Sequence, residues 1–250
     1  MENYNDKLES IIIGRNPVLE ALKSNETIDT LYISSTGGVI SHIVALAKEK
    51  NITIKNVSDK KLSSMCDNKS HQGVIATIGS AEYVSLEDIL KVSKDKGTSP
   101  FIVICDEIED PHNLGAIIRT CETAGVDGII IPKRRSATLN ATVRKTSAGA
   151  VSYVPVARVS NLASAIETLK QNNVWIYGTD ADGENYTNVD LTGGIALVIG
   201  SEGFGMGKLI RDKCDFLLSL PMFGKVNSLN ASVAGGIFIY EAVRQRLIKK

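Results

Sequence analysis

Small polar residues precede the last helical pattern of the chain, in the stretch VNSLNASVAGGI (residues 226–237). Ser228 offers a hydroxyl, Leu229 an apolar contact and Asn230 a side-chain amide, and the first N–H groups of a helix have no partner within that helix. These groups can bind a ligand, or Ser228 or Asn230 can cap the helix. Small residues at 231–236 favour close packing of the same helix. The stretch alone does not decide between three interpretations: a ligand site, a helix cap and a packing seam.

A glycine-rich loop, IGSEGFGMG (residues 199–207), follows the apolar run IALVI. Glycines let a backbone approach a ligand closely and adopt positive φ. The spacing does not match the G-x-G-x-x-G dinucleotide motif, and Lys208 is followed by Leu209 where a phosphate loop has Ser or Thr. Glu202 is unexpected in a simple turn, because a glycine-rich helix entrance usually suits anions. A flexible turn and a ligand-binding loop are both consistent with the pattern.

A third candidate is PHNLGAIIRT (residues 111–120), which follows the apolar run FIVIC and several acids. Asn113 fits the cap position of a helix. Arg119 lies six residues later, about 600° of helical rotation, so the two side chains do not share a stripe. The simplest alternative for Arg119 is a surface ion pair with an acid such as Glu122.

Apolar runs typical of buried strands precede all three segments: FIVIC, IALVI and FLLSL. Such strands alternate with helical patterns, which predicts an α/β fold with a mainly parallel sheet covered on both faces. Ligands of open α/β sheets bind beyond the carboxyl ends of the strands, where these segments lie. A smaller α/β pattern comes first, and the polar run KVSKDKGTSP predicts a linker. We therefore expect one domain at residues 1–79, a linker at 80–99 and a second domain at 100–250.

The composition is that of an ordinary globular protein, with 28 basic and 28 acidic residues and a formal net charge of +0. This balance neither indicates nor excludes a nucleic-acid partner. The four cysteines form no CxxC pair and no zinc-like cluster, so we expect reduced, mostly buried thiols and no metal. The first ten residues are unlike a signal peptide, and no apolar run reaches the ~18 residues of a transmembrane helix. A cytoplasmic protein with no membrane partner is expected.

Together the three segments resemble the signature motifs of one family. The N-x-x-x-x-x-R-T spacing from Asn113 to Thr120, IGSEGFGM, and LPM-x-G-x-V-x-SLN-x-SVA are similar to the three motifs of the SpoU, or TrmH, group of SPOUT RNA ribose methyltransferases. GRNPVLEAL and HQGV resemble the two-domain members of this group, so the likeness spans nearly the whole chain. The nearest resemblance is to RlmB-type 23S rRNA (guanosine-2′-O)-methyltransferases.

The resemblance implies a SPOUT methyltransferase domain with a deep trefoil knot at 100–250 and an N-terminal RNA-binding domain at 1–79. It implies a homodimer whose active site takes residues from both subunits, with S-adenosyl-L-methionine as cofactor. The implied cofactor-binding residues are Gly200, Leu220, Leu229, Thr179 and Gly203. The implied catalytic residues are Arg119, Asn113, Glu202, Ser228 and Asn230.

The implied reaction is methyl transfer to a ribose 2′-oxygen, with a guanosine of 23S rRNA as the expected target. It requires orientation of the reactants and removal of a hydroxyl proton, but no metal. Because a guanidinium stays protonated in proteins, we expect Arg119 to position an RNA phosphate and stabilise the developing alkoxide. tRNA is an alternative substrate, disfavoured by the separate N-terminal domain. A non-catalytic RNA-binding or ribosome-assembly protein is disfavoured by the intact motifs, and a nucleotide-binding dehydrogenase by the missing glycine motif.

Acidic residues are absent between Gly128 and Ile166, while basic residues are frequent there. In a chain without net charge this span predicts a local positive zone suited to RNA phosphates, and scattered solvated surface is the alternative. His71 is a candidate RNA contact or a structural residue. The candidate RNA-binding residues are Lys133, Arg134, Arg135, Arg144 and Lys145.

Overall fold

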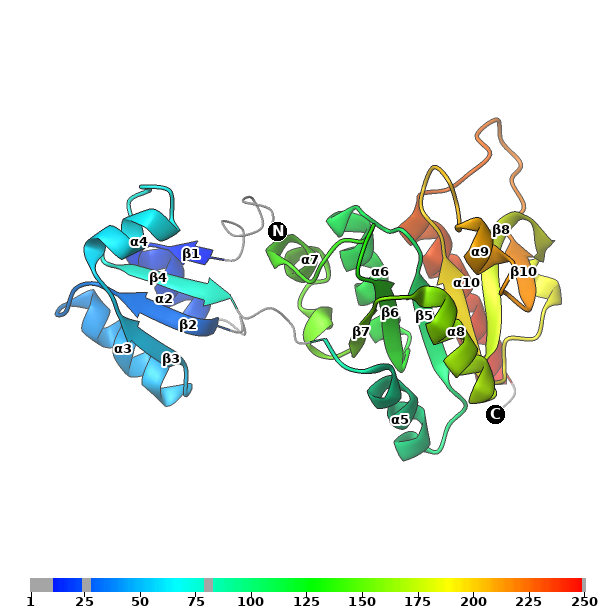
Figure 1. Cartoon of the computed structure of the whole chain (residues 1–250), viewed down its shortest axis with the longest axis horizontal. Helices are drawn as coiled ribbons and strands as arrows, with labels where there is room; N and C mark the ends of the chain where they lie inside the picture. Colours follow the sequence, from blue (N-terminus) through cyan, green and yellow to red (C-terminus); the bar gives the residue numbers. More distant parts are fainter. Residues whose placement is uncertain (1–10, 24–27, 79–82, 249–250) are drawn as a thin grey trace. The chain divides into compact units, whose positions relative to one another are not determined.

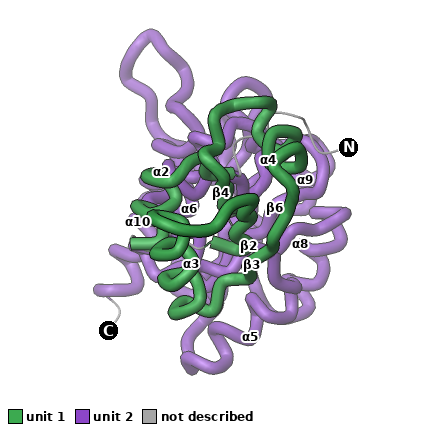
Figure 2. The backbone as a smooth tube through the Cα atoms, turned by 90° about the vertical axis from the view of Figure 1, so that its left-hand side faces the viewer, with its two compact units in different colours: residues 1–81 green, residues 82–250 purple. Residues whose placement is uncertain are grey.

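The computed structural model describes residues 11–23, 28–78 and 83–248. The chain divides into two compact units, Met1–Ala81 and Glu82–Lys250 (Figure 2). The first ten residues, for which the sequence predicts no signal peptide, lie outside the described residues.

The first unit is built on a mixed four-stranded sheet of order β1-β4-β2-β3. Strand β4 is antiparallel to β1 and β2, whereas β2 and β3 are parallel. Helices α2 and α3 bury apolar side chains such as Leu22 and Ile43 against Leu31 of β2. The elements are β1 (Ile11–Ile13), α2 (Arg15–Lys23), β2 (Ile28–Ile33), α3 (Val39–Glu49), β3 (Thr53–Asn56), α4 (Asp59–Met65) and β4 (Val74–Ile78).

The second unit has a six-stranded sheet of order β10-β8-β9-β5-β6-β7 in which every neighbouring pair is parallel. The predicted α/β fold with a mainly parallel sheet is confirmed. The elements are α5 (Leu86–Lys96), β5 (Phe101–Cys105), α6 (Pro111–Thr123), β6 (Gly128–Pro132), α7 (Ala141–Thr146), β7 (Val156–Val159), α8 (Leu162–Gln171), β8 (Trp175–Asn185), β9 (Ile195–Ile199), α9 (Lys208–Arg211), β10 (Phe216–Ser219) and α10 (Ala231–Ile248), with 3-10 turns at Ala150–Ser152 and Tyr186–Asn188.

The two central strands, β5 and β9, are neighbours where the strand order reverses direction. From β5 the chain continues to β6 and β7 on one side, and β8 and β10 lie on the other side beyond β9. All residues of β5 and β9 are buried, as expected for strands covered on both faces. In open parallel sheets a ligand site forms at such a reversal, beyond the carboxyl ends of the two strands. The loops after β5 and β9 are therefore the first place to look for a site.

Helices cover both faces of this sheet. Apolar side chains of α5, α8 and α9 share one buried cluster with side chains of the strands. Helices α6 and α10 pack against each other, and α10 also packs against β9. Figure 1 shows α8 in front of the sheet and α10 behind it.

Helix α5 lies within the segment that the sequence predicts as a linker. Ser85 caps the helix in a capping box with Asp88, and Gly97 ends it in a left-handed conformation. Leu86, Ile89 and Leu90 are buried in the core of the second unit. The polar run KVSKDK is the last part of this amphipathic helix rather than a linker, and its charged residues are exposed while Ser93 is buried. Residues 83–99 thus belong to the second unit.

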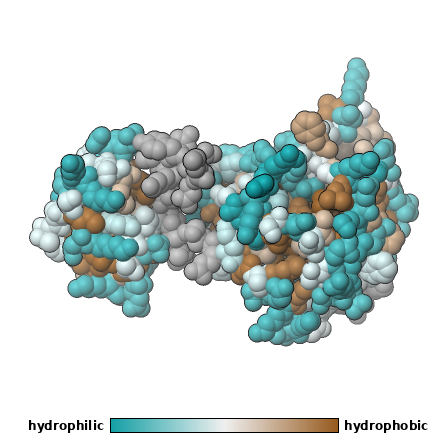
Figure 3. Space-filling model, in the orientation of Figure 1, coloured by the Kyte–Doolittle hydropathy of each residue, from teal (hydrophilic) through white to brown (hydrophobic). Residues whose placement is uncertain are grey.

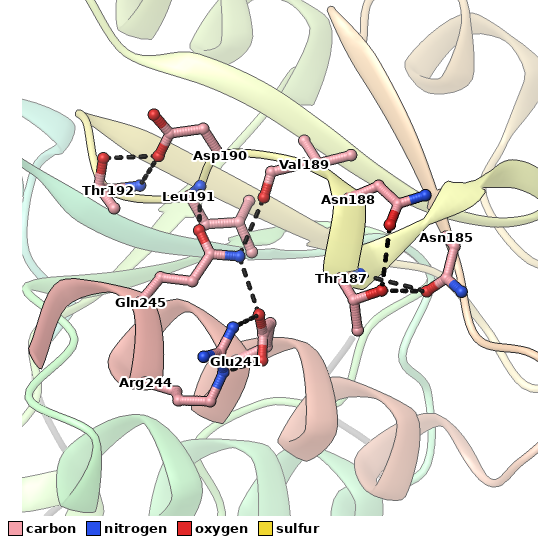
Figure 4. Close-up of polar contacts among 10 residues, drawn as sticks. All are labelled: Asn185, Thr187, Asn188, Val189, Asp190, Leu191, Thr192, Glu241, Arg244 and Gln245. Carbon is pink, nitrogen blue, oxygen red and sulfur yellow. Dashed lines mark hydrogen bonds and ion pairs between the residues drawn. The ribbon is translucent and has the colours of Figure 1, made fainter. Parts of the chain in front are cut away.

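Helix α10 is fastened to the connection between β8 and β9 by a polar network (Figure 4). The side chain of Gln245 accepts a hydrogen bond from the Leu191 N–H and donates to the Val189 carbonyl and to Glu241. The Arg244 guanidinium donates two hydrogen bonds to the same carboxylate, which lowers the pKa of Glu241. These contacts hold α10 against sliding along its axis. They therefore also set the position of the residues at its amino end.

A close approach of α10 to β9 completes the positioning. A Cβ atom on Gly235 would lie 2.6 Å from Cδ1 of the buried Ile199, so the small side chain lets the helix settle on the strand. The packing seam predicted at residues 231–236 is present at Gly235.

The thiols are free, and Cys66, Cys105 and Cys121 are buried while Cys214 is half-buried, as predicted. Burial raises the pKa of Cys105 to about 12. Within the described ranges, no helix is long and apolar enough to cross a membrane, and no three His, Cys, Asp or Glu side chains cluster as metal ligands.

Candidate active site

The amino end of α6 delivers Asn113 to the carboxyl end of β5. Asp110 caps the helix, accepting a hydrogen bond of 2.9 Å from the His112 N–H, and Pro111 occupies the first turn. The predicted cap role of Asn113 is therefore wrong, because the helix begins two residues earlier. Asn113 is instead buried in the first turn, where its amide is free for tertiary contacts.

The loop after β9 folds back sharply on itself. Ser201 and Gly205 exchange two backbone hydrogen bonds of 2.9 Å. A Cβ atom on Gly200 would lie 2.3 Å from the carbonyl carbon of Gly205, so no side chain fits at residue 200. The turn presents Glu202, Gly203 and Phe204 at an exposed tip.

Asp106 supports this loop from the end of β5. Its carboxylate is buried and accepts a 2.8 Å hydrogen bond from the Gly207 N–H, while its own N–H donates to the Ile199 carbonyl. Burial raises the pKa of Asp106, and the hydrogen bond from Gly207 only partly opposes this shift. The loops that follow β5 and β9 are thus held side by side.

Asn230, at the start of α10, joins the two loops. Its side-chain oxygen accepts hydrogen bonds from the N–H and hydroxyl of Ser232 at 3.0 and 2.6 Å, which caps the helix. Its side-chain nitrogen donates to Asn113 at 2.9 Å and to Glu202 at 2.7 Å. Asn113 also donates to Glu202 at 3.3 Å. Three segments distant in the sequence meet in this triangle, and Asn230 acts as cap and as site residue together.

The other two predicted catalytic residues do not join this triangle. Arg119 is exposed, almost two helical turns beyond Asn113, and within the described part of the chain its guanidinium forms no hydrogen bond or ion pair, including with Glu122. Ser228 lies in the segment 221–229, all of whose residues are exposed, and it likewise makes no hydrogen bond to a described residue.

The predicted cofactor residues other than Leu229 fall on three adjacent strands, β10, β8 and β9, or in the loops that follow them. Thr179 in β8 donates its hydroxyl to the Val198 carbonyl at 3.0 Å. Leu220 directly follows β10, and Leu229, with 38% of its surface exposed, precedes the cap of α10. Thr179, Gly200 and Leu220 thus lie on or directly after three adjacent strands of the sheet.

The predicted RNA-binding residues occupy the same edge of the sheet. Lys133, Arg134 and Arg135 follow β6 and are exposed, and Arg144 and Lys145 lie in the last turn of α7. Arg135 forms a 2.8 Å ion pair with Glu107, which raises the pKa of Arg135. Both residues of this pair adopt positive φ, a strained conformation that is common at functional sites.

His71, the remaining candidate RNA contact, is buried in the first unit. Its Nε2 lies 3.1 Å from the Ser63 hydroxyl, and its Nδ1 accepts a hydrogen bond from the Gly73 N–H. These contacts hold the turn before β4, so the structural interpretation of His71 is the better one.

A cavity of about 520 Å³ lies beside the triangle, between the loops that follow β5 and β9. Asn113 and Glu202 line it, and Phe204 is 94% exposed. The sequence analysis did not predict this cavity. Two features of the sequence could have indicated it: the acidic run DEIED after β5 and a phenylalanine between glycines. The further lining residues include Glu107, Ile108, Glu109, Asp110 and Arg135.

Two family descriptions match this chain. Residues 100–240 match the SpoU rRNA Methylase family, and residues 11–84 match the family described as RNA 2'-O ribose methyltransferase substrate binding. The first match covers more than half of the chain, which therefore belongs to the SpoU rRNA methylase family. The protein is thus an RNA methyltransferase of the SpoU/TrmH type.

Relatives of nearly the same length support this assignment. The Bacillus subtilis protein YacO, assigned to the TrmH family of tRNA/rRNA methyltransferases, is 48% identical over 238 residues, which are 94% of this chain and 95% of YacO. A protein of Staphylococcus aureus strain COL with the same family assignment is 45% identical over 95% of this chain and 97% of its own length.

Solved structures share the fold. The SpoU methyltransferase AviRb from Streptomyces viridochromogenes, in complex with the cofactor AdoMet, has a TM-score of 0.68 at 23% identity, covering 98% of this chain and 94% of AviRb. An AdoMet-bound rRNA methyltransferase from Sinorhizobium meliloti has a TM-score of 0.66 at 24% identity, covering 96% and 88%. The TrmH/SpoU tRNA modifying enzyme of A. aeolicus has a TM-score of 0.56 at 32% identity, covering 66% and 85%.

Proposed function

We propose that this enzyme transfers a methyl group from S-adenosyl-L-methionine to the 2′-oxygen of a ribose, at a guanosine of 23S rRNA. The observation that carries the proposal is the contact among Asn113, Glu202 and Asn230. It lies at the reversal point of a parallel sheet, in a chain of the SpoU rRNA methylase family.

The residues around the Gly200 loop fit the proposed cofactor by their chemistry. Peptide groups at Gly200, Gly203 and Leu220 can pair with an adenine and a ribose, and the accessible Leu229 can cover the adenine face. Thr179 lies on the neighbouring strand β8. The Glu202 carboxylate suits the positive charge of a sulfonium. Bound S-adenosyl-L-methionine would supply an activated methyl group.

The chain's own residues would orient the ribose and manage its proton. Glu202 is held by two amides, so its carboxylate presents a fixed negative charge at the site. We assign Ser228 a hydrogen bond to the ribose or cofactor, and Arg119 the positioning of an RNA phosphate beside the developing alkoxide. Fixed orientation of this kind supplies much of the catalysis in transfers that need no metal.

A homodimer with shared active sites accounts for the exposure of Arg119. Helix α10 exposes apolar side chains at Val233 and Ile237, and Tyr240 donates a hydrogen bond to Thr123 on the Arg119 helix. In Figure 3, hydrophobic side chains also gather at the base of the projecting loop before α10. Exposed apolar clusters of this kind are typical of subunit interfaces.

We further propose the deep trefoil knot of the family. Its support is the path of the chain, which leaves edge strand β10 and returns through residues 220–230 to α10, packed on β9 and α6.

Ribosomal RNA is favoured over tRNA by the extent of the fold matches. The rRNA methyltransferase of S. meliloti covers 96% of this chain, whereas the tRNA modifying enzyme of A. aeolicus covers 66%. The first unit matches a substrate-binding family, and we assign it the docking of RNA in the cytoplasm. Lys133, Arg134, Arg144 and Lys145 would bind phosphates on the second unit.

Two measurements test the proposal. S-adenosyl-L-methionine should raise the melting temperature of the native protein, because a ligand that binds only the folded state stabilises it. Tritiated cofactor should then label one ribose in rRNA from cells that lack the enzyme. Labelling of tRNA alone would reassign the substrate, and binding of RNA without any methyl transfer would leave a non-catalytic RNA-binding protein.

A further inference from the structure

The cavity beside the triangle is distinct from strand β8 and the end of β10, where the proposed cofactor residues Thr179 and Leu220 lie. It lies between the loops after β5 and β9 and shares Asn113 and Glu202 with the proposed reaction site. At about 520 Å³ it is large enough for one nucleobase with its ribose. Phe204 lines it with a ring that is 94% exposed. An exposed aromatic ring beside a reaction site offers a stacking surface to a ligand with a flat apolar face.

Charge restricts which part of an RNA can enter. Glu107, Glu109 and Asp110 line the cavity together with Glu202, and Arg135 is the basic residue of the lining. Phosphates are repelled by such a surface, while the exposed basic residues after β6 can hold them at the rim. A base carries no charge, and unstacked RNA bases are commonly stacked on aromatic side chains.

One carboxylate of the lining is free to accept hydrogen bonds from a base. Asp110 caps α6, Glu107 pairs with Arg135, and the Glu202 carboxylate holds two amides. Glu109 is exposed and, within the described ranges, makes no hydrogen bond or ion pair. A single carboxylate can accept two parallel hydrogen bonds, and guanine is the base that presents adjacent N1–H and N2–H donors on one edge.

We propose that this cavity receives the base of the target nucleotide, that Phe204 stacks on it, and that Glu109 selects guanine by accepting from N1–H and N2–H. The proposal rests on the function proposed above and assigns the residues that choose the nucleotide. Phe204 and Glu109 are specificity residues beside the triangle, which acts on the ribose of the same nucleotide.

Binding of short fluorescent oligoribonucleotides tests the base site without knowledge of the natural target. The probes are UUGUU, UUIUU, UUAUU, UUCUU and UUUUU, where inosine (I) lacks only the N2 amino group. Their affinities for the full-length protein with S-adenosylhomocysteine are measured by anisotropy at low salt. We expect UUGUU to bind about tenfold more tightly than UUIUU, the gain from one additional well-placed hydrogen bond to a carboxylate.

Two pairs of variants assign the roles. Glu109→Ala, which removes the acceptor oxygens, should abolish the preference for guanosine over inosine, while Glu87→Ala, at an exposed carboxylate on α5, should preserve it. Phe204→Leu should weaken UUGUU about tenfold through loss of stacking, and Phe204→Tyr should restore it. Equal binding of all five probes by the wild type, or a preference for adenosine or cytidine, would overturn the proposal.

Calorimetry with S-adenosyl-L-methionine separates this proposal from the proposed function. If the wild type does not bind the cofactor, the methyltransferase proposal fails. If it binds the cofactor and shows no preference for UUGUU, the base site alone fails.

Discussion

Asn230 uses the two ends of one amide for different purposes. Its oxygen caps α10, and its nitrogen connects Asn113 with Glu202. The position of the helix start and the geometry of the site are therefore coupled through a single side chain. A substitution that preserves one end and removes the other can separate the two contributions.

Asn230→Ser preserves a cap acceptor and removes the amide donor, whereas Asn230→Ala removes both. We expect the serine variant to keep its stability within about 0.5 kcal/mol and the alanine variant to lose about 1 kcal/mol. Both should lose about 100-fold in methyl-transfer rate, because the Asn113 and Glu202 side chains are no longer tied. Urea unfolding and single-turnover kinetics measure the two effects. A serine variant with wild-type rate would show that the triangle is only structural.

Sequence reasoning found the three segments because each places small polar residues after a buried strand. It misassigned Asn113 as a cap, since Asp110 and Asn113 are both good cap residues and local pattern does not choose between them. It could not place the Arg119 side chain, whose guanidinium makes no hydrogen bond or ion pair with a described residue. Phe204 and Glu109 carry no periodicity, so only the cavity they line reveals them.

The Gly200 loop offers a matched pair of substitutions at the scale of an element. A Cβ on Gly200 would press on the backbone of Gly205 and Met206 at 2.3–2.4 Å, whereas a Cβ on Gly203 would meet nothing within 4 Å. We expect Gly200→Ala to cost about 1–3 kcal/mol and Gly203→Ala less than about 0.5 kcal/mol. Fluorescence of the single tryptophan, Trp175 in β8, reports unfolding of the second unit in urea. Equal stabilities would mean that the loop folds back less tightly.

The anchor of α10 should make stability depend on pH. The hydrogen bonds from Arg244 lower the folded-state pKa of Glu241 below its ordinary value of 4.5. This contribution is present above pH 4.5 and is lost as the pH falls through the folded-state pKa. Glu241→Gln should therefore be about 1 kcal/mol less stable than wild type at pH 7, with a gap that narrows below pH 4.5. Glu184→Gln, at an exposed position in β8, is the control. A stability difference between wild type and Glu241→Gln that does not change with pH would contradict the anchor role.

The helices and strands were largely predictable from apolar runs and cap residues. The two wrong predictions have local causes. Helix α5 was mistaken for linker because the buried Leu86, Ile89 and Leu90 were outweighed by the polar run KVSKDK, most of which is exposed. The sequence VSYVPVARV predicts one strand from residue 151, but Pro155 interrupts it and β7 begins at Val156. Both cases turn on which residues meet the core.

At the scale of the whole molecule, strand order was beyond the reach of local pattern. The placement of β9 between β5 and β8 decides that the loops after β5 and β9 share a site. No residue spacing encodes that neighbourhood, because it follows from packing among segments about 90 residues apart. The family resemblance supplied the expectation of a shared site, and the parallel sheet accounts for how it forms.

In the proposed homodimer, mixed dimers test whether Arg119 serves the site of the partner subunit. Arg119→Ala and Asn230→Ser should each lose nearly all activity as homodimers. If the arginine acts across the interface, a mixed dimer carries one complete and one doubly damaged site, so dimers isolated through two different tags should show about half of wild-type activity. The control is Asn113→Ala mixed with Asn230→Ser. These two residues bind each other within one chain, so every site in the mixed dimer is damaged and activity should stay absent. No activity with Arg119→Ala would place the complete site within one chain. Restored activity in the control would reject this arrangement of the dimer.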